Sequence, residues 1–142
     1  MIYLDSCYLA KLYLMEPDSP AVRARARASG EVVCCRIGWG EVVATLHRHL
    51  RDGRLTAPQF HLLSTQVAAD VKAGLWTPLP ITTELAEAQA RRMTGLSDQV
   101  FLRAADALHL TCAAEAGLKE VYSSDRHLVA AAPHFGLQPV TL

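Results

Sequence analysis

Ile2-Tyr3-Leu4-Asp5 lies at the start of the chain, and a similar pattern, an apolar run followed by an aspartate, recurs near its end in Val121-Tyr122-Ser123-Ser124-Asp125. Each run has the length and composition of a short buried strand. Between them, strand-like and helix-like segments alternate, which is typical of a parallel sheet covered by helices on both faces. The sequence therefore predicts an α/β fold: a three-layer α/β/α domain with a parallel sheet of four to five strands.

The other elements follow from periodicity and from turn residues. We expect strands over residues 2–4, 32–35, 75–79, 119–123 and 137–141. We expect helices over residues 7–14, 20–30, 41–50, 57–72, 83–93, 102–116 and 126–132. Ser19 before Pro20 and Thr83 before its helix are expected N-caps, and Gly74 is an expected helix stop. Residues 1–142 form one expected domain, without repeats or linkers.

Composition excludes several classes of protein. With 14 basic and 14 acidic residues the formal net charge is zero, which argues against coating nucleic acid by bulk charge but allows a local basic groove. No apolar run approaches the roughly 20 residues that span a bilayer, and Asp5 interrupts any N-terminal signal sequence. We expect a cytoplasmic protein that does not enter membranes.

The cysteines indicate neither a zinc site nor a disulfide scaffold, because none of the four forms a C-x-x-C pair. Cys34 and Cys35 lie in an apolar run and are expected to be buried in a strand. Cys7 and Cys112 fall in helical patterns and are expected to behave as small apolar residues.

Four acidic residues are the main candidates for chemistry. Asp5 and Asp125 follow strands, Glu41 lies near the start of a helix, and Asp106 is surrounded by small and apolar residues. Ligand sites of open α/β sheets lie beyond the carboxyl ends of the strands. A lone carboxylate in an apolar setting is costly to bury unless it is paired or binds a metal. We therefore expect these four carboxylates to converge on a hard cation such as Mg²⁺ or Mn²⁺.

Each acid also has a simpler explanation. Asp5 and Asp125 could be helix N-caps, and Glu41 could be an exposed first-turn acid favoured by the helix dipole. Asp106 is the hardest to explain in this way, because its neighbours offer few polar partners and Asp is a poor helix former.

The histidines show no acid/base partner in the sequence. His109, three residues after Asp106, is expected to make a structural hydrogen bond to the backbone or to a neighbouring helix. His47 and His49 are expected to face solvent. Because the nucleophile and phosphate-binding motifs of other enzyme classes are absent, any chemistry falls to the carboxylates and a metal.

Four motifs stand out along the chain: Tyr3-Leu4-Asp5-Ser6 leading into Leu9-Ala10-Lys11-Leu12; the helix-opening Glu41 followed by Leu46; Leu102-Arg103-Ala104-Ala105-Asp106-Ala107-Leu108-His109-Leu110; and Val121-Tyr122-Ser123-Ser124-Asp125-Arg126-His127-Leu128 leading into Ala131-Ala132 and Gly136-Leu137. On these motifs the chain resembles the PIN-domain ribonucleases and, within them, the VapC-like toxins of toxin–antitoxin systems. The resemblance covers essentially the whole chain.

The resemblance implies an Mg²⁺- or Mn²⁺-dependent endoribonuclease that acts on RNA, is neutralised by a small cognate antitoxin protein, and is commonly a homodimer. It implies catalytic and metal-binding roles for four residues, Asp5, Glu41, Asp106 and Asp125. It also implies that Ser123, where the family has Thr or Ser, and the adjoining Ser6 orient the site.

Sequence proximity suggests further contacts. Lys11, Arg103 and Arg126 are the candidates for binding RNA phosphates. An antitoxin-facing groove is expected between the helices at Pro20–Ser29 and Glu41–Leu50. Four apolar side chains are the candidates to line it: Val22, Ala26, Val43 and Leu46.

Three other functions fit parts of the pattern. A PIN-type nuclease of RNA processing or quality control would need no antitoxin. A catalytically inactive PIN-like interaction module would not need all four acids. An aspartyl-phosphate receiver would need a second acid beside Asp5 or a D-x-D-x-[TV] run, and the sequence has neither.

Overall fold

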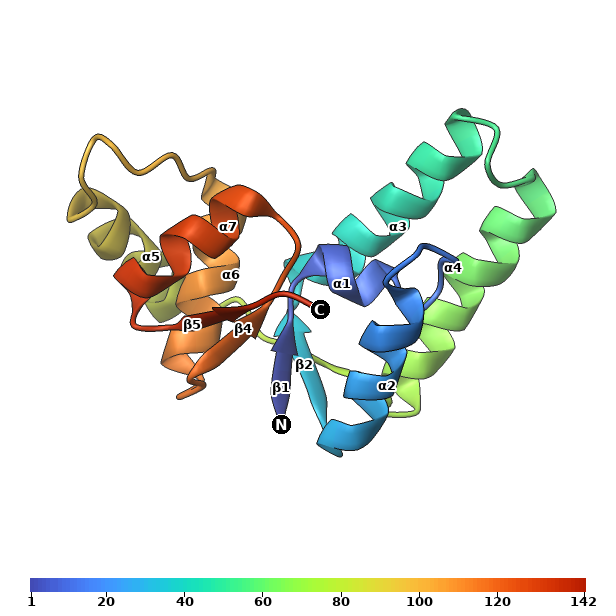
Figure 1. Cartoon of the computed structure of the whole chain (residues 1–142), viewed down its shortest axis with the longest axis horizontal. Coiled ribbons are helices and arrows are strands. Elements are labelled where there is room, and N and C mark those ends of the chain that lie inside the picture. The colour runs from blue at the N-terminus through green and yellow to red at the C-terminus, as the bar shows by residue number, and fades with distance from the viewer.

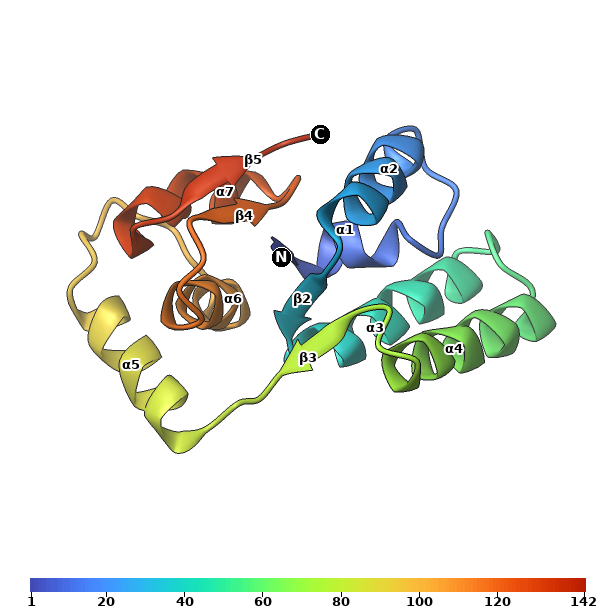
Figure 2. The same ribbon diagram turned by 90° about the horizontal axis from the view of Figure 1, so that it is seen from below.

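Five parallel strands form one sheet in the computed structural model, which describes residues 1–142. They lie in the order β3-β2-β1-β4-β5, so the sheet grows outward from β1 in both directions (Figures 1 and 2). The strands are β1 (Ile2–Leu4), β2 (Val32–Cys35), β3 (Thr77–Leu79), β4 (Glu120–Tyr122) and β5 (Gln138–Val140). The predicted parallel sheet is confirmed, with five strands.

Seven α-helices and one 3₁₀ helix connect the strands and cover the sheet. They are α1 (Ser6–Ala10), α2 (Ser19–Ser29), α3 (Ile37–Arg51), α4 (Ala57–Lys72), α5 (Thr83–Thr94), α6 (Ala104–Glu115), α7 (Arg126–Ala131) and the 3₁₀ helix η1 (Ala132–Phe135). Figure 1 shows helices α1 to α4 on one side of the molecule and α5 to α7 on the other. No helix is both long and apolar enough to cross a lipid bilayer.

The core consists of two clusters, one on each face of the sheet. Tyr3 and Val33 pack with buried residues of α5, α6 and α7. Leu4 and Cys34, the next residues along their strands, pack with α1 to α4. Side chains of successive strand residues point to opposite faces, and in a parallel sheet both faces are buried. The strands therefore separate two helical layers, which confirms the three-layer architecture.

Helix boundaries largely follow local signals. Thr56 caps α4 in a capping box with Gln59, and the helix covers the expected residues 57–72. The expected N-cap at Ser19 is wrong: Ser19 lies inside the first turn, where its Oγ donates to the Leu14 carbonyl at 2.8 Å. The cap of α5 is Thr82 rather than Thr83.

Helices α1 and α3 differ most from the prediction. Helix α1 ends at Ala10, four residues before the expected end at Leu14. The other helix is α3. It begins at Ile37, four residues before the expected start, so Glu41 lies in its second turn. His49 is buried rather than solvent-facing, with its Nε2 3.7 Å from Oε1 of Glu16 in the loop after α1. Val22 and Leu46 are fully buried and belong to the core, so they cannot line an open groove.

Candidate active site

The carboxyl ends of β1 and β4 define the point from which the sheet grows in opposite directions. Leu4, the last residue of β1, pairs with Tyr122, the last residue of β4. The chain runs from β1 to β2 on one side and places β4 on the other. At such a switch point the loops diverge to opposite faces and leave a crevice, the usual ligand site of an open α/β sheet. Asp5 and Asp125 both lie here.

All four predicted acids line one cavity of about 240 Å³ at this crevice. Asp5 follows β1, Glu41 comes from α3, Asp106 from the first turn of α6, and Asp125 directly precedes α7. The other lining residues are Ser6, Cys7, Arg103, Ala105, His109 and Leu128. The structure thus brings together four carboxylates from four separate segments of the chain.

Asp5 is buried and held through both carboxylate oxygens. Its Oδ1 accepts hydrogen bonds from the backbone N–H of Tyr8 at 3.1 Å and from Sγ of Cys7 at 2.8 Å. Its Oδ2 accepts one from Oγ of Ser123 at 2.5 Å. Burial raises the pKa of Asp5, although these three hydrogen bonds oppose the shift. Asp5 is therefore both an N-cap of α1 and a wall of the cavity.

Ser123 connects the two strand ends through one oxygen atom. While its Oγ donates to Asp5, the same atom accepts from the backbone N–H of Asp125 at 2.9 Å. Asp125 in turn caps α7 through Oδ1, which accepts from the backbone N–H of His127 and Leu128. The capping explanation of Asp125 is correct, and its other oxygen still faces the cavity.

A guanidinium group lies between two of the acids. Nε of Arg103 donates to Oδ2 of Asp106 at 2.9 Å, and Nη2 donates to Oδ2 of Asp125 at 3.2 Å. Arg103 was predicted as a phosphate contact, and in this structure its charge is shared by two carboxylates.

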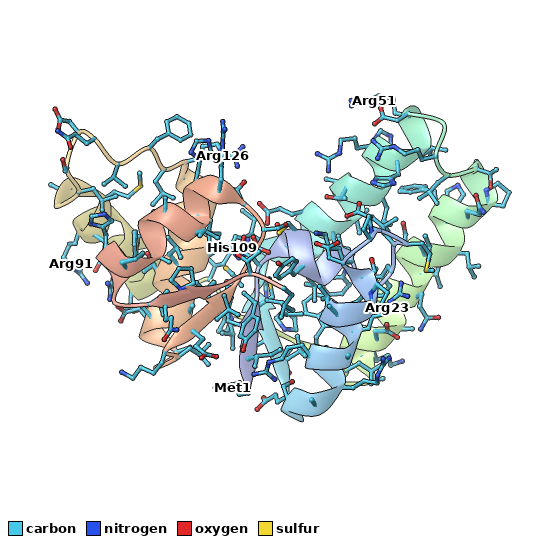
Figure 3. All side chains as sticks on the ribbon, in the orientation of Figure 1. Met1, Arg23, Arg51, Arg91, His109 and Arg126 are labelled. Carbon is cyan, nitrogen blue, oxygen red and sulfur yellow. The ribbon has the colours of Figure 1, made fainter.

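Glu41 is held by His109. Nε2 of His109 lies 2.7 Å from Oε2 of Glu41, and its Nδ1 lies 2.8 Å from Oη of Tyr3. Burial would raise the pKa of Glu41, but the hydrogen bond and charge of His109 lower it below its usual value. The expected structural hydrogen bond of His109 is confirmed, with a site acid as one partner. Figure 3 labels His109 near the middle of the molecule, between the two groups of helices.

Gly38 allows α3 to approach this histidine. A Cβ at Gly38 would lie 2.4 Å from Sγ of Cys34 and 3.4 Å from Cε1 of His109. The first distance is a severe clash, so a larger residue fits here only if the buried Cys34 side chain or its surroundings move. Glu41 follows three residues later, one turn along α3. The close approach is visible only in three dimensions.

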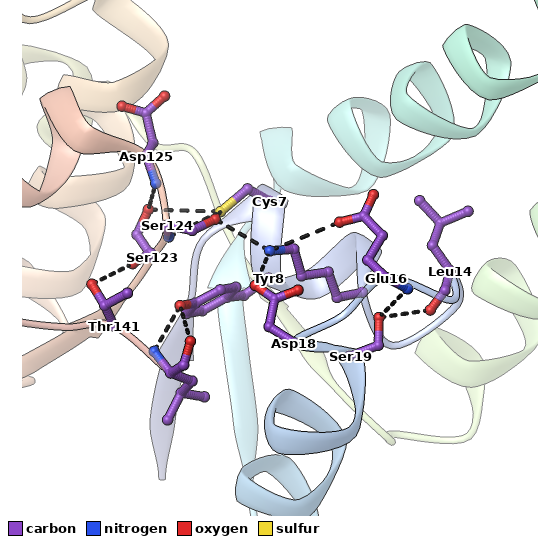
Figure 4. Close-up of polar contacts among 12 residues, drawn as sticks. Cys7, Tyr8, Leu14, Glu16, Asp18, Ser19, Ser123, Ser124, Asp125 and Thr141 are labelled. Carbon is purple, nitrogen blue, oxygen red and sulfur yellow. Dashed lines mark hydrogen bonds and ion pairs between the residues drawn. The ribbon is translucent and has the colours of Figure 1, made fainter. Parts of the chain in front are cut away.

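Cys7 is a cavity residue that sequence reasoning missed. Its Sγ donates to Asp5, and the backbone N–H of Ser124 donates to the same sulfur at 3.3 Å. Burial and the neighbouring charge of Asp5 raise the pKa of Cys7 to about 12, so it remains a thiol that can donate. Figure 4 shows the sulfur lying beside Ser123 and Ser124.

The two other basic candidates differ in exposure. Lys11 is 8% exposed; its Nζ pairs with Asp18 and Glu16 and donates to Oγ of Ser124. These partners weaken Lys11 as a candidate for binding RNA. Arg126, at the start of α7, is exposed and labelled in Figure 3.

The donors fit a hard divalent cation by type, because four carboxylates supply only oxygen ligands. As placed, no three His, Cys, Asp or Glu side chains are close enough to form a ready-made metal site. The guanidinium between Asp106 and Asp125 nevertheless shows that these two acids accept a cation between them. The site is therefore suited to a cation but, with Arg103 in place, is not pre-assembled around one.

This combination of fold and site is that of a PIN domain, and residues 2–132 match the PIN-domain family. The chain belongs to this family, as its sequence motifs predicted. Its fold is similar to the crystal structure of Mycobacterium tuberculosis VapC20, described as a sarcin-ricin loop cleaving toxin, with a TM-score of 0.72 and 19% sequence identity. The similarity covers 92% of this chain and 95% of VapC20. No curated protein sequence matches the chain.

Proposed function

We propose that the protein is an Mg²⁺- or Mn²⁺-dependent endoribonuclease that hydrolyses phosphodiester bonds of RNA. One observation carries the proposal: four carboxylates from four segments line a single cavity at the switch point of a parallel sheet. Membership of the PIN-domain family supports the same reading. Carboxylate-held metals are well suited to phosphodiester hydrolysis, because no side-chain nucleophile is then required.

The four acids have different proposed roles in metal binding. Asp5, Asp106 and Asp125 are the proposed principal ligands, and Glu41 ligates directly or through a water that it orients. The bound metal supplies an activated water and stabilises the leaving oxygen. Ser123 and Cys7 fix the direction of the Asp5 carboxylate by donating to its two oxygens. Ser6 adjoins Asp5 on the cavity wall.

Arg103 and Arg126 are the proposed RNA contacts. Arg103 is 61% exposed and already sits at the mouth of the cavity, where an RNA phosphate could replace its carboxylate partners. Because the chain has zero net charge, we expect binding to be local and only moderately dependent on salt.

We further propose that the nuclease is the toxin of a toxin–antitoxin pair, that it works in the cytoplasm, and that it forms a homodimer. The sequence resemblance and the similarity of fold to VapC20 support the toxin assignment. The sarcin-ricin loop, which VapC20 cleaves, is the first RNA to test. The alternative is a PIN nuclease of RNA processing, and induced expression distinguishes the two. A toxin should arrest growth unless its antitoxin is co-expressed.

The antitoxin site proposed here is not the groove predicted between α2 and α3. A larger apolar cavity of about 560 Å³ lies between the loop after α1 and the facing parts of α3 and α4. Met15 and Leu62 line it and are 84% and 68% exposed. Apolar side chains this exposed fit an apolar segment of a partner. Met15→Asp with Leu62→Asp should prevent neutralisation by the antitoxin and leave RNA cleavage intact.

The catalytic proposal is tested by Asp106→Asn, which removes one charge at nearly constant shape. We expect at least a ~100-fold loss of cleavage with the fold retained, on the order reported for damage to a metal site. Asp98→Asn, on the loop before α6, is the matched control. Full activity in purified Asp106→Asn would rule out the proposed site.

A further inference from the structure

A chain of buried polar groups runs behind Glu41. The backbone N–H of Cys35 donates to Oη of Tyr3 at 2.9 Å, Oη lies 2.8 Å from Nδ1 of His109, and Nε2 of His109 lies 2.7 Å from Oε2 of Glu41. These groups come from β2, β1, α6 and α3. Tyr3 is fully buried and His109 is 2% exposed. The row therefore connects the centre of the sheet to one acid of the cavity.

The hydrogen-bond direction at Glu41 is determined by its carboxylate. An ionised carboxylate can only accept, so Nε2 of His109 carries the hydrogen of the 2.7 Å contact and donates it to Oε2. Oη of Tyr3 accepts from the backbone N–H of Cys35 and keeps both an O–H and a second lone pair, so it can pair with Nδ1 whether or not that nitrogen carries a hydrogen. In both states of the ring His109 donates to Glu41.

We propose that His109 is a positioning residue for the reaction: oriented by Tyr3, it holds one oxygen of Glu41 and so aims the other at the cavity. This inference rests on the proposed nuclease function for its effect on catalysis. The hydrogen bond itself is independent of that function.

The need for such a contact follows from the location of Glu41. Its side chain is 31% exposed, whereas that of His109 is 2% exposed. A glutamate has several rotatable bonds, and a partly exposed one samples many rotamers unless a fixed partner restrains it. His109 is fixed, because both ring nitrogens are hydrogen-bonded and the side chain is buried. Catalytic groups that are held in place before binding lose less entropy in the reaction.

Two substitutions of His109 separate its two contacts. The amide of Gln reaches approximately the position of Nε2, so His109→Gln can still donate to Glu41. The shorter Asn reaches approximately the position of Nδ1, so His109→Asn can still meet Tyr3 but not Glu41. Tyr3→Phe keeps the buried ring and removes only the hydroxyl that orients the histidine. It supplies a test even if His109→Asn does not fold.

The experiment measures kcat, KM and Mn²⁺ affinity for these variants, with circular dichroism to verify folding. His109→Asn should lower kcat and Mn²⁺ affinity about 10-fold or more, the usual effect of losing a partner behind a metal ligand. KM for RNA should change little. Tyr3→Phe should show a smaller loss in the same two quantities, and His109→Gln should recover most of both. Equal kcat and equal Mn²⁺ affinity in the Gln and Asn variants would overturn the proposal.

A spectroscopic measurement keeps this inference separate from the proposed function. Long-range ¹H–¹⁵N spectra of the metal-free wild-type protein should show His109 with a protonated Nε2. An unprotonated Nε2 would overturn the inference whether or not the protein cleaves RNA. If the wild-type protein cleaves no RNA but Nε2 is protonated, the positioning contact stands and the nuclease proposal fails.

Discussion

Arg103 donates from Nε to Oδ2 of Asp106 at 2.9 Å across the first turn of α6. Its Nη2 also reaches Asp125, so one guanidinium is shared by two of the four acids. The Arg103 side chain is 61% exposed, and an ion pair this exposed contributes little stability. Displacement of Arg103 from the two carboxylates by another cation should therefore cost little free energy.

Removal of Arg103 should strengthen metal binding. In Arg103→Ala no internal cation competes for Asp106 and Asp125, and we expect Mn²⁺ affinity to rise about two- to fivefold, the scale of an exposed ion pair. Titration calorimetry measures this directly. Arg91→Ala, which alters an exposed pair with Glu87 on α5, is the control and should leave the affinity unchanged. Weaker Mn²⁺ binding in Arg103→Ala would show that the guanidinium supports the site instead.

The same variant should bind RNA less well. The comparison uses an inactive Asp5→Asn background across a salt series, in which loss of one phosphate contact lowers both the affinity and the salt slope. Arg103 would be dismissed as an RNA contact if neither quantity changed.

Asp5→Asn should stabilise the metal-free protein near neutral pH. Burial raises the folded-state pKa of Asp5 above its ordinary value of 3.8. The stability associated with protonated Asp5 is present below pH 3.8 and is lost as the pH rises through the folded-state pKa. The amide introduced by Asp5→Asn carries no charge at any pH, so that variant does not lose this stability as the pH rises. Thermal melts should therefore show a gain for Asp5→Asn that shrinks as the pH falls towards 3.8. A gain that grew on acidification would mean that the folded protein prefers the ionised form.

Two neighbouring glycines of α3 should respond oppositely to alanine. Gly38→Ala places a Cβ 2.4 Å from Sγ of Cys34, so we expect a loss of about 1–3 kcal/mol from overpacking, together with reduced cleavage as Glu41 moves. Gly40 is exposed and a Cβ there would meet nothing within 4 Å. Gly40→Ala should therefore stabilise the helix by about 0.5–1 kcal/mol. Denaturant unfolding of both variants measures the difference. Similar free energies of unfolding would contradict the close packing of α3 on Cys34 of β2.

Divalent metal should raise the melting temperature of the wild-type protein. Neighbouring carboxylates repel one another, and a cation that binds only the folded state adds stability by mass action. Millimolar Mg²⁺ or Mn²⁺ should raise the midpoint of thermal unfolding, and less so in Asp106→Asn. An identical rise of the melting temperature in both proteins would indicate that the metal binds elsewhere.

The acids were predictable because the position of an acid at a strand end is a local feature of the sequence. In a parallel α/β fold the residue after a strand is often also the residue before a helix. Asp5 and Asp125 therefore cap helices and line the cavity at once, so the capping explanation is correct and does not exclude the metal-binding role, which stays a prediction. Asp106 was identified by its apolar neighbours, which leave it Arg103 as a partner.

The contacts that hold the acids were not predictable, because their partners are far apart in the sequence. Tyr3 and His109 are separated by 106 positions, and no periodicity connects them. The sequence predicts a solvent-facing His49, but the loop that carries Glu16 brings its carboxylate near the ring. The sequence also suggests Lys11 as an RNA contact, whereas its pairing with Asp18 depends on how that loop folds back.

The most direct test of the central claim is the initial rate of RNA cleavage by the purified wild-type protein, measured with Mg²⁺ or Mn²⁺ and again in excess chelator. The account predicts cleavage that requires the divalent ion, returns when the ion is restored, and is absent in Asp5→Asn under all conditions. Cleavage that persisted in chelator, or that survived in Asp5→Asn, would contradict a metal-dependent nuclease centred on these four carboxylates.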